Sequence, residues 1–322
     1  MAEKILAVCG PTASGKTSLS IRLAQRLGGE IVSMDSMQVY RGMRIGTAAP
    51  TVEEMQGIPH HLIGFVEPDA PFSCADYVTL AASCIRDITA RGKLPILCGG
   101  TGLYLDSLLR VSAFSDAEGS QTVRASMHEF AEKQGTQALH DRLAAVDPIA
   151  AAAIHPNNVR RVVRALEIYE TTGVTKTEWD RRSLAAEPKY DARIFVMDFH
   201  NRDLLYDRID RRVDLMMQDG LEAEVRTLWE DGLLDARYIA AQAIGYKEFL
   251  PYFEGEGTLS DVTAQISLST RHYAKRQLTW FRRYRDALWL YPDTDGDSCA
   301  PLKTAEELSS EAEEKLRKQG FL

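Results

Sequence analysis

The chain has 322 residues, of which 45% are hydrophobic and 26% are charged, proportions ordinary for a soluble globular protein of one large or two smaller domains. The net charge of −8 argues mildly against a nucleic-acid partner, although local charge decides binding. Five cysteines without a C-x-x-C pair, no signal peptide and no apolar run of membrane-spanning length predict a cytoplasmic protein without a structural zinc site or membrane contact.

The first predicted strand, residues 4–9, runs directly into a glycine-rich loop. Gly10–Thr17 reads GPTASGKT and fits G-x-x-x-x-G-K-[ST], the phosphate-binding P-loop, and leucines at helical spacing predict a helix over 17–27. Backbone N–H groups and the helix N-terminus cradle phosphate, Lys16 adds a charge, and the Thr17 hydroxyl suits Mg²⁺. The residues expected to bind a polyphosphate or diphosphate are Gly10, Thr12, Ala13, Ser14, Gly15, Lys16 and Thr17.

Two further predicted strands end in residues that can carry chemistry. The strand over 30–34 ends at Asp35, and the strand over 94–98 ends at the glycine-rich turn Gly99–Gly102. Because ligands bind at the carboxyl ends of strands in open α/β sheets, both should lie beside the P-loop. Asp35 is then a carboxylate for Mg²⁺ or for proton transfer, or a plain cap of a turn or helix. Thr101 either contacts a ligand, with the glycines allowing close approach, or only caps its turn.

The chain changes character after residue 111. Residues 112–190 contain no good strand and resemble a series of short helices, whereas strand and long-helix patterns return afterwards. These returning elements are a strand over 193–199, a helix over 201–219, a helix near 258–285, a strand over 287–291 and a terminal helix around 305–314. We therefore expect an α/β protein with a P-loop NTPase-like core and a central, mostly parallel sheet, formed by residues 1–111 and 191–322, with 112–190 as a helical insertion domain.

Two basic clusters interrupt the acidic average. One is Arg160–Arg164, and the other runs from Arg271 to Arg285 with aromatic residues interleaved and no acidic residue. Basic side chains mixed with aromatic rings suit single-stranded RNA, but an amphipathic helix with a solvated basic face explains the second cluster equally well. The neighbouring His60 and His61 lack acidic or cysteine partners spaced for a metal, so we expect them to be structural.

Taken together, the motifs resemble those of the tRNA dimethylallyltransferase family, also called tRNA isopentenyltransferases, of bacterial type. The resemblance spans nearly the whole chain, in order and at plausible spacing, and the tail lacks the zinc-finger extension of eukaryotic relatives. The motifs that carry it are Gly10–Thr17, Asp35–Tyr40, Gly46–Ala48, Pro59–Leu62, Gly99–Tyr104, His155–Asn157, Arg160–Arg164, Gly220–Val225, Ile244–Lys247 and Lys275–Arg282.

The resemblance implies a reaction and a catalytic set. A dimethylallyl group would move from dimethylallyl diphosphate to N6 of the adenine 3′ of the anticodon, in tRNAs that read codons beginning with U. Asp35 would be the general base, Thr101 would position substrate, and Arg212 would reach the diphosphate together with the P-loop and Mg²⁺ held near Thr17. Arg212 has an alternative as a surface ion pair with acidic residues of its own helix.

The resemblance also implies contacts with the tRNA anticodon stem-loop, and Gln38 is well placed to read a flipped adenine. We expect a monomer. The residues expected to contact tRNA are Asp35, Ser36, Met37, Gln38, Thr101, Arg124, Arg160, Arg161, Val162, Val163, Arg164, Gln242, Ala243, Ile244, Gly245, Tyr246, Lys247, Lys275, Arg276, Gln277, Leu278, Thr279, Trp280, Phe281 and Arg282.

Three other functions stay open from the residues alone. A P-loop small-molecule kinase would bind ATP and use Asp35 as base for an acceptor hydroxyl, with the insertion as a lid. An adenylate isopentenyltransferase would modify free AMP, but it would need neither both basic clusters nor the C-terminal helical segment. A non-catalytic RNA-binding protein with a regulatory nucleotide pocket is the third.

Overall fold

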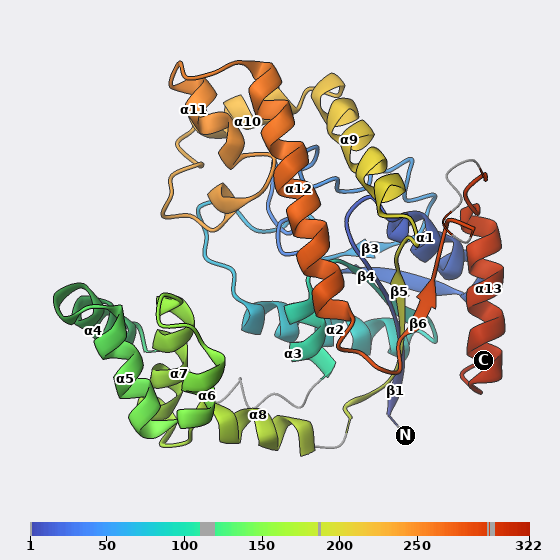
Figure 1. Ribbon diagram of the computed structural model, residues 1–322. Coiled ribbons are helices and arrows are strands. Elements are labelled where there is room, and N and C mark those ends of the chain that lie inside the picture. The colour runs from blue at the N-terminus through green and yellow to red at the C-terminus, as the bar shows by residue number, and fades with distance from the viewer. Residues whose placement is uncertain (1, 110–119, 186–187, 295, 297–299) are drawn as a thin grey trace. The chain divides into compact units, whose positions relative to one another are not determined.

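The computed structural model describes residues 2–109, 120–185, 188–294, 296 and 300–322 (Figure 1). The chain divides into two compact units, an α/β unit of Met1–Asp106 with Tyr190–Leu322 and a helical unit of Ser107–Lys189. The expected boundaries, 1–111 with 191–322 and 112–190, lie close to this division. The RNA contact expected of the insertion stays a prediction.

The α/β unit is built on one six-stranded sheet with the order β3-β2-β4-β1-β5-β6. Every pair of neighbouring strands is parallel, so the expected α/β class with a mostly parallel sheet is confirmed and the sheet is wholly parallel. The short β3 had no counterpart in the sequence prediction, because two residues cannot show a periodicity. The strands are β1 (Glu3–Cys9), β2 (Gly29–Ser33), β3 (His60–His61), β4 (Leu94–Gly99), β5 (Tyr190–Met197) and β6 (Leu288–Leu290).

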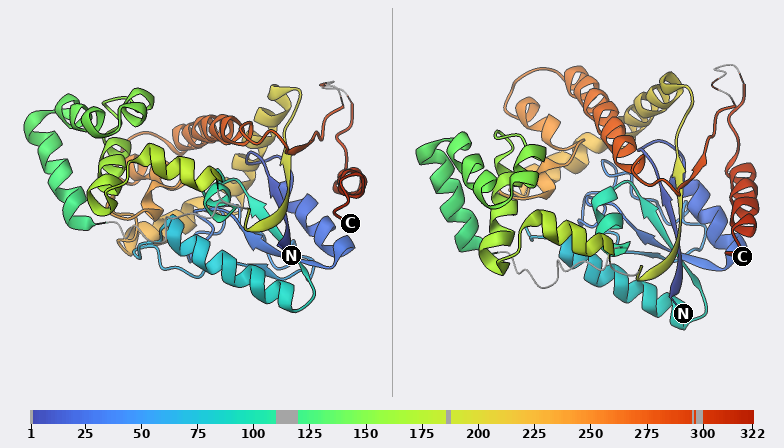
Figure 2. Two further views of the ribbon diagram at one scale, coloured as in Figure 1. Left: turned by 90° about the horizontal axis from the view of Figure 1, so that it is seen from below. Right: turned by 60° about the horizontal axis from the view of Figure 1, so that its bottom comes forward.

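Helices cover both faces of this sheet. Successive strand residues point to opposite faces, and Leu6 and Val8 of β1 pack in one hydrophobic cluster with α1 (Lys16–Leu27) and α13 (Ala305–Lys318), which lie side by side in Figures 1 and 2. Cys9 points to the other face, where Tyr77 of α2 lies near it. The remaining helices of this unit are α2 (Cys74–Ala90), α3 (Gly102–Leu109), α9 (Arg202–Gln218), α10 (Leu221–Glu230), η2 (Ala240–Gln242), η3 (Lys247–Phe249), α11 (Leu250–Phe253) and α12 (Leu259–Phe281).

The long helix α12 begins at a capping box, in which Thr258 and Asp261 satisfy each other's backbone N–H groups. It ends at Phe281, before the residue 285 expected from the sequence, because the chain turns there and the Tyr284 N–H donates to the Phe281 carbonyl at 3.0 Å. α12 packs against α9. This pair of helices brings polar residues from late in the chain to the carboxyl edge of the sheet.

The helical unit has a hydrophobic core of its own. No strand occurs among its described residues, as the sequence pattern predicted. Among the described residues of the whole chain, no helix is both long and apolar enough to cross a membrane. The helices of this unit are α4 (Gln121–Gln134), α5 (Thr136–Val146), α6 (Pro148–Ala153), α7 (Val159–Thr172) and α8 (Lys176–Ala185).

Candidate active site

The P-loop backbone has conformations that few residue types adopt readily. Gly10 has φ of 141°, and a Cβ there would lie 2.7 Å from the Met197 carbonyl oxygen of β5. Ala13 has φ of 62°, in the left-handed region, and its carbonyl accepts a hydrogen bond of 2.8 Å from Arg208 Nε of α9. Lys16 Nζ donates to the Pro11 carbonyl at 3.2 Å. The loop conformation is therefore held by its own residues and by β5 and α9.

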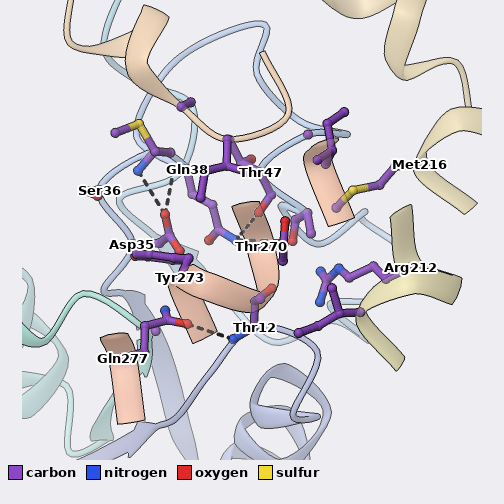
Figure 3. A pocket seen from close by; sticks show the side chains of 18 of the residues that line it. Thr12, Asp35, Ser36, Gln38, Thr47, Arg212, Met216, Thr270, Tyr273 and Gln277 are labelled. Carbon is purple, nitrogen blue, oxygen red and sulfur yellow. Dashed lines mark hydrogen bonds between the residues drawn. The ribbon is translucent and has the colours of Figure 1, made fainter. Parts of the chain in front are cut away.

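A cavity of about 270 Å³ lies above the P-loop, within the α/β unit. Two walls of the cavity differ in the residues that form them. The P-loop wall consists of Thr12, Lys16 and Thr17, and the Gln38 wall consists of Asp35–Gln38 and Gly46–Ala48. Figure 3 shows Arg212 and Met216 reaching toward the cavity from one helix, opposite Asp35 and Gln277. The other lining residues are Cys98, Gly99, Ile209, Val213, Gln242, Ala243, Ile244, Lys247, Ile266, Thr270, Tyr273 and Arg276.

Asp35 caps a turn and also lines the cavity, and its expected chemical role stays a prediction. Its Oδ1 accepts the Met37 N–H at 2.9 Å and the Gln38 N–H at 3.4 Å, so the carboxylate caps the turn after β2. The half-buried side chain also lines the cavity. The cap fixes the carboxylate at the cavity wall, where it can accept a proton.

Thr101 lies beside the cavity but is not among the residues that line it. Its hydroxyl accepts the Ser36 N–H at 3.1 Å and is hydrogen-bonded to the hydroxyl of Tyr273. Thr101 therefore holds the turn that carries Asp35, and its expected contact with substrate stays a prediction.

Two positive charges of the site, Lys16 and Arg212, come from different elements. Lys16 lies in the P-loop wall, and Arg212 extends from α9 into the same cavity. Burial lowers the pKa of both groups, and Arg212 also lowers that of Lys16, because two neighbouring cations disfavour each other. In the described part of the chain, which includes all of α9, Arg212 forms no ion pair with an acidic residue of its own helix, and Asp210 pairs with Arg271. The alternative of a surface ion pair for Arg212 is therefore not supported. An anion bound between the two cations would relieve their repulsion.

Gln277 of α12 joins the two glycine-rich loops of the site. Its Oε1 accepts the Thr12 N–H of the P-loop at 3.0 Å (Figure 3). Its Nε2 donates to the Gly100 carbonyl at 3.1 Å. A Cβ on Gly100 would lie 1.9 Å from that Nε2, and a Cβ on Gly102 would lie 2.2 Å from the Trp280 ring. Gly100 and Gly102 thus make room for side chains of α12. Gly99 of the same turn lines the cavity, so the expected close approach of a ligand to this turn stays a prediction.

The side chain of Gln38 is already hydrogen-bonded at both ends. Its Nε2 donates to the carbonyls of Thr47 and Ala48, each at 3.2 Å, and its Oε1 accepts from Ser33 Oγ at 2.9 Å. The amide is therefore oriented by the protein, and its expected reading of a base stays a prediction.

The expected Mg²⁺ site can be tested against the oxygen donors present. Thr17 and Asp35 both line the cavity and offer a hydroxyl and a carboxylate, the ligand types that Mg²⁺ prefers. No group of three or more metal-binding His, Cys, Asp or Glu residues occurs among the described positions. The donors fit an ion held mainly by a substrate's phosphates, with one or two protein ligands.

His60 and His61 have structural partners. His60 Nδ1 lies 2.8 Å from the Ile58 carbonyl oxygen, and His61 Nε2 lies 2.8 Å from Glu30 Oε2. The His61 contact ties the short strand β3 to β2, whereas the His60 contact is local to the segment that precedes β3.

The four arginines of the helical unit that are expected to contact tRNA divide into two groups. Arg160 and Arg161 are exposed on α7, whereas Arg124 and Arg164 both bind the buried carboxylate of Glu167, at 2.6 and 2.7 Å. Val162 and Val163, expected to contact tRNA, are buried in the core of the unit, because every third or fourth residue of an amphipathic helix faces inward. That part of the expectation is corrected for these two valines.

The same correction applies to parts of the two C-terminal motifs. Gln242, Ala243, Ile244, Lys247 and Arg276 line the cavity, and Lys275, Thr279 and Arg282 are exposed. Trp280 is half-buried, with the Arg283 guanidinium 4.1 Å from its ring centroid. The residues whose side chains are buried away from the cavity or absent are Gly245, Tyr246, Leu278 and Phe281. Gln277 is also buried but lines the cavity, and its expected contact with tRNA stays a prediction.

Sequence reasoning missed the apolar part of the cavity. Ile209, Val213 and Met216 of α9 share the face that carries Arg212, and Ile266 and Thr270 of α12 line the cavity as well. Their spacing of three to four residues is the helical period, which by itself predicts a buried face and not a ligand site.

Comparison with known proteins places this cavity in a family context. A family model described as IPP transferase matches residues 38–284, and one described as Isopentenyl transferase matches residues 3–63. Curated proteins named tRNA dimethylallyltransferase include one from Geobacillus thermodenitrificans, 49% identical over 90% of each chain, and one from Bacillus subtilis, 50% identical over 89% of this chain and 90% of the relative.

Solved structures agree in fold. A full-length tRNA isopentenylpyrophosphate transferase from Bacillus halodurans superposes with a TM-score of 0.69 at 44% identity, covering 99% of this chain and 98% of the other. A eukaryotic dimethylallyltransferase described as acting on tRNA superposes with a TM-score of 0.79 at 30% identity, covering 99% and 85%.

Proposed function

The chain belongs to the IPP transferase family, and from this premise we propose that it transfers a dimethylallyl group from dimethylallyl diphosphate to N6 of an adenine in tRNA, with release of diphosphate. The adenine is the one on the 3′ side of the anticodon, in tRNAs that read codons beginning with U. The observation that carries the proposal is that Lys16, Arg212 and Asp35 line one cavity.

The P-loop wall suits the leaving group. As the allylic C–O bond breaks, negative charge develops on the diphosphate, and fixed cations and N–H donors stabilise it. Lys16 and Arg212 provide the charges, and the side chains of Ile209, Val213 and Met216 offer apolar surface to the dimethylallyl group. Thr17 would hold Mg²⁺ together with phosphate oxygens, and such an ion would neutralise further charge on the leaving group.

The Gln38 wall suits the acceptor. The N6 amine forms the new C–N bond as the C–O bond breaks, and it must lose one proton in the process. Asp35 is held at the cavity wall by the turn that it caps and can take up that proton. The adenine has to leave its stack to enter the cavity.

We further propose that the protein acts on tRNA as a cytoplasmic monomer and binds the anticodon stem-loop through exposed basic residues. A direct test is to incubate the protein with labelled dimethylallyl diphosphate and either unmodified tRNA or AMP, and separately with ATP plus small acceptors. Label appearing in tRNA supports the proposal. Label in AMP, or consumption of ATP by a small acceptor, would establish one of the rival activities in its place.

The arginines of α7 allow a test of the RNA contact. If Arg160 and Arg161 meet phosphates, alanine at either should weaken all substrate tRNAs and flatten the dependence of log affinity on log salt by about 0.7–0.9 per contact. Arg164→Ala is the matched comparison, because it deprives a buried carboxylate of one partner and should instead lower the melting temperature. Unchanged affinity and slope in the Arg160 and Arg161 variants would remove α7 from the RNA interface.

A further inference from the structure

One carboxylate outside the cavity organises a wall of it. Glu224, in the first turn of α10, accepts hydrogen bonds from three consecutive backbone N–H groups, those of Arg44 at 2.9 Å, Ile45 at 2.8 Å and Gly46 at 3.1 Å. Three such N–H groups form a concave site for an anion. A side chain 178 residues further along the chain therefore fixes this segment.

A tyrosine completes the arrangement. The Tyr246 hydroxyl donates to Glu224 Oε1 at 2.6 Å, and its fully buried ring lies against Gly46, where a Cβ would come within 2.5 Å of the ring. Burial, with the Glu224 charge beside it, holds the pKa of Tyr246 far above its usual range, so the hydroxyl remains a donor. Glu224 and Tyr246 together clamp the backbone at residues 44–46.

The clamped backbone continues directly into the Gln38 wall. The carbonyls of Thr47 and Ala48, immediately after the clamp, accept both hydrogen bonds from the Gln38 amide. The Gln38 backbone N–H in turn points to Asp35 Oδ1, in the turn that the same carboxylate caps. Hydrogen bonds joined by short covalent segments thus connect Glu224 to the carboxylate proposed as the base.

We propose that Glu224 is a positioning residue for the acceptor side of the reaction. It touches neither substrate nor the P-loop wall, and it acts by holding Gly46–Ala48 so that Gln38 and Asp35 meet the incoming adenine in one geometry. This inference rests on the proposed transfer to adenine. It predicts that loss of Glu224 slows the reaction with tRNA but leaves the binding of diphosphate unchanged. The reason is that the P-loop is held by other residues, Arg208 and Gln277.

The test uses the full chain with Glu224→Gln. Glutamine keeps the size of the side chain, but its NH₂ group opposes backbone N–H donors and the negative charge is lost. We expect kcat/KM for unmodified tRNA to fall about tenfold or more, while the Kd for inorganic diphosphate stays within about twofold of the wild type. Glu222→Gln is the matched control in the same helical turn. Glu222 is paired with Arg226 at 2.7 Å, with no second ion pair among the residues that the structure describes, so its loss should change neither quantity.

A second variant covers the case in which Glu224→Gln fails to fold. Tyr246→Phe keeps the ring against Gly46 and removes one hydrogen bond, so kcat/KM for tRNA should fall by about threefold with diphosphate affinity retained. Wild-type kinetics in both variants would overturn the inference, as would an equal loss of tRNA and diphosphate affinity. A wild-type protein that labels no RNA would refute the proposed function itself, and this inference would fall with it.

Discussion

The two walls of the cavity are built by opposite means. The P-loop wall comes from one stretch of eight residues between a strand and a helix, and its shape follows from residues within that stretch and two ties from outside. The Gln38 wall is assembled from two segments of the chain and is held by Thr101, Glu224 and Tyr246, all distant in sequence.

This difference has a functional consequence. A phosphate cradle is a general device, since any chain with the motif offers the same N–H groups and lysine. In the proposed reaction the Gln38 wall has to suit one nucleophile, and its geometry depends on contacts that no local motif encodes. Substitutions in the P-loop wall should therefore act on the donor, and substitutions in the Gln38 wall should act on turnover or on the acceptor.

The largest effect should come from Asp35→Asn in the Gln38 wall. Asparagine keeps an oxygen that can accept the Met37 N–H, so the turn survives, but the proton acceptor is lost. Turnover should fall roughly 10²–10⁴-fold, the usual size of a general-base contribution, with tRNA affinity near normal. Single-turnover rates and binding to an anticodon stem-loop measure the two quantities. Near-normal turnover would remove Asp35 from the mechanism.

The next effect should come from Lys16→Ala in the P-loop wall. Loss of one preorganised charge at the leaving group should lower kcat/KM for dimethylallyl diphosphate by roughly 10²–10³-fold, with tRNA affinity unchanged. Lys318→Ala, on the exposed face of α13, is the control and should have no effect. ATP should be neither consumed nor required, and stoichiometric ATP hydrolysis during transfer would revive the kinase alternative.

A smaller effect on the same wall is expected from Gln277→Leu. Leucine removes the acceptor for the Thr12 N–H and the donor for the Gly100 carbonyl, leaving both backbone groups unpaired in a buried place. The KM for the donor should rise about tenfold and the melting temperature should fall. Gln265→Leu, on an exposed turn of the same helix, should do neither. If the KM for tRNA rose instead, Gln277 would belong to the acceptor side.

The smallest effect is a pH dependence of donor capture. Because burial and the neighbouring Arg212 lower the pKa of Lys16, its charge is present at low pH and is lost as pH rises, earlier than for a free lysine. In the wild type, kcat/KM for dimethylallyl diphosphate should therefore fall as pH rises. The midpoint of this fall should lie at a pH lower than 10.5, the ordinary lysine value. The residual activity of Lys16→Ala should lack this alkaline limb. An identical limb in the variant would assign it to another group.

The contrast between the two walls also separates what could be predicted. The strand–loop–helix order at Gly10–Thr17, the carboxylate after the second strand and the helical character of the insertion all follow from short-range patterns. The structure shows the first two, and it shows helices in the described residues 120–185 of the insertion. The two-residue strand β3 and the position of the apolar face of α9 in the cavity wall were not predicted. The strand is too short to show a period, and the α9 pattern is the same as that of any buried helix face.

The sequence by itself determined the α/β class, the phosphate cradle, the position of Asp35 at the cavity edge and, through motifs along the chain, the family. Only the tertiary structure decided how side chains divide their roles. Gln277 is a buried tie between two loops, Arg164 holds Glu167, and Glu224 clamps the Gln38 wall. The physical reason is the separation in sequence of the interacting groups. Helical and strand periods arise from neighbouring residues, whereas a buried hydrogen bond depends on which distant group the fold brings within about 3 Å.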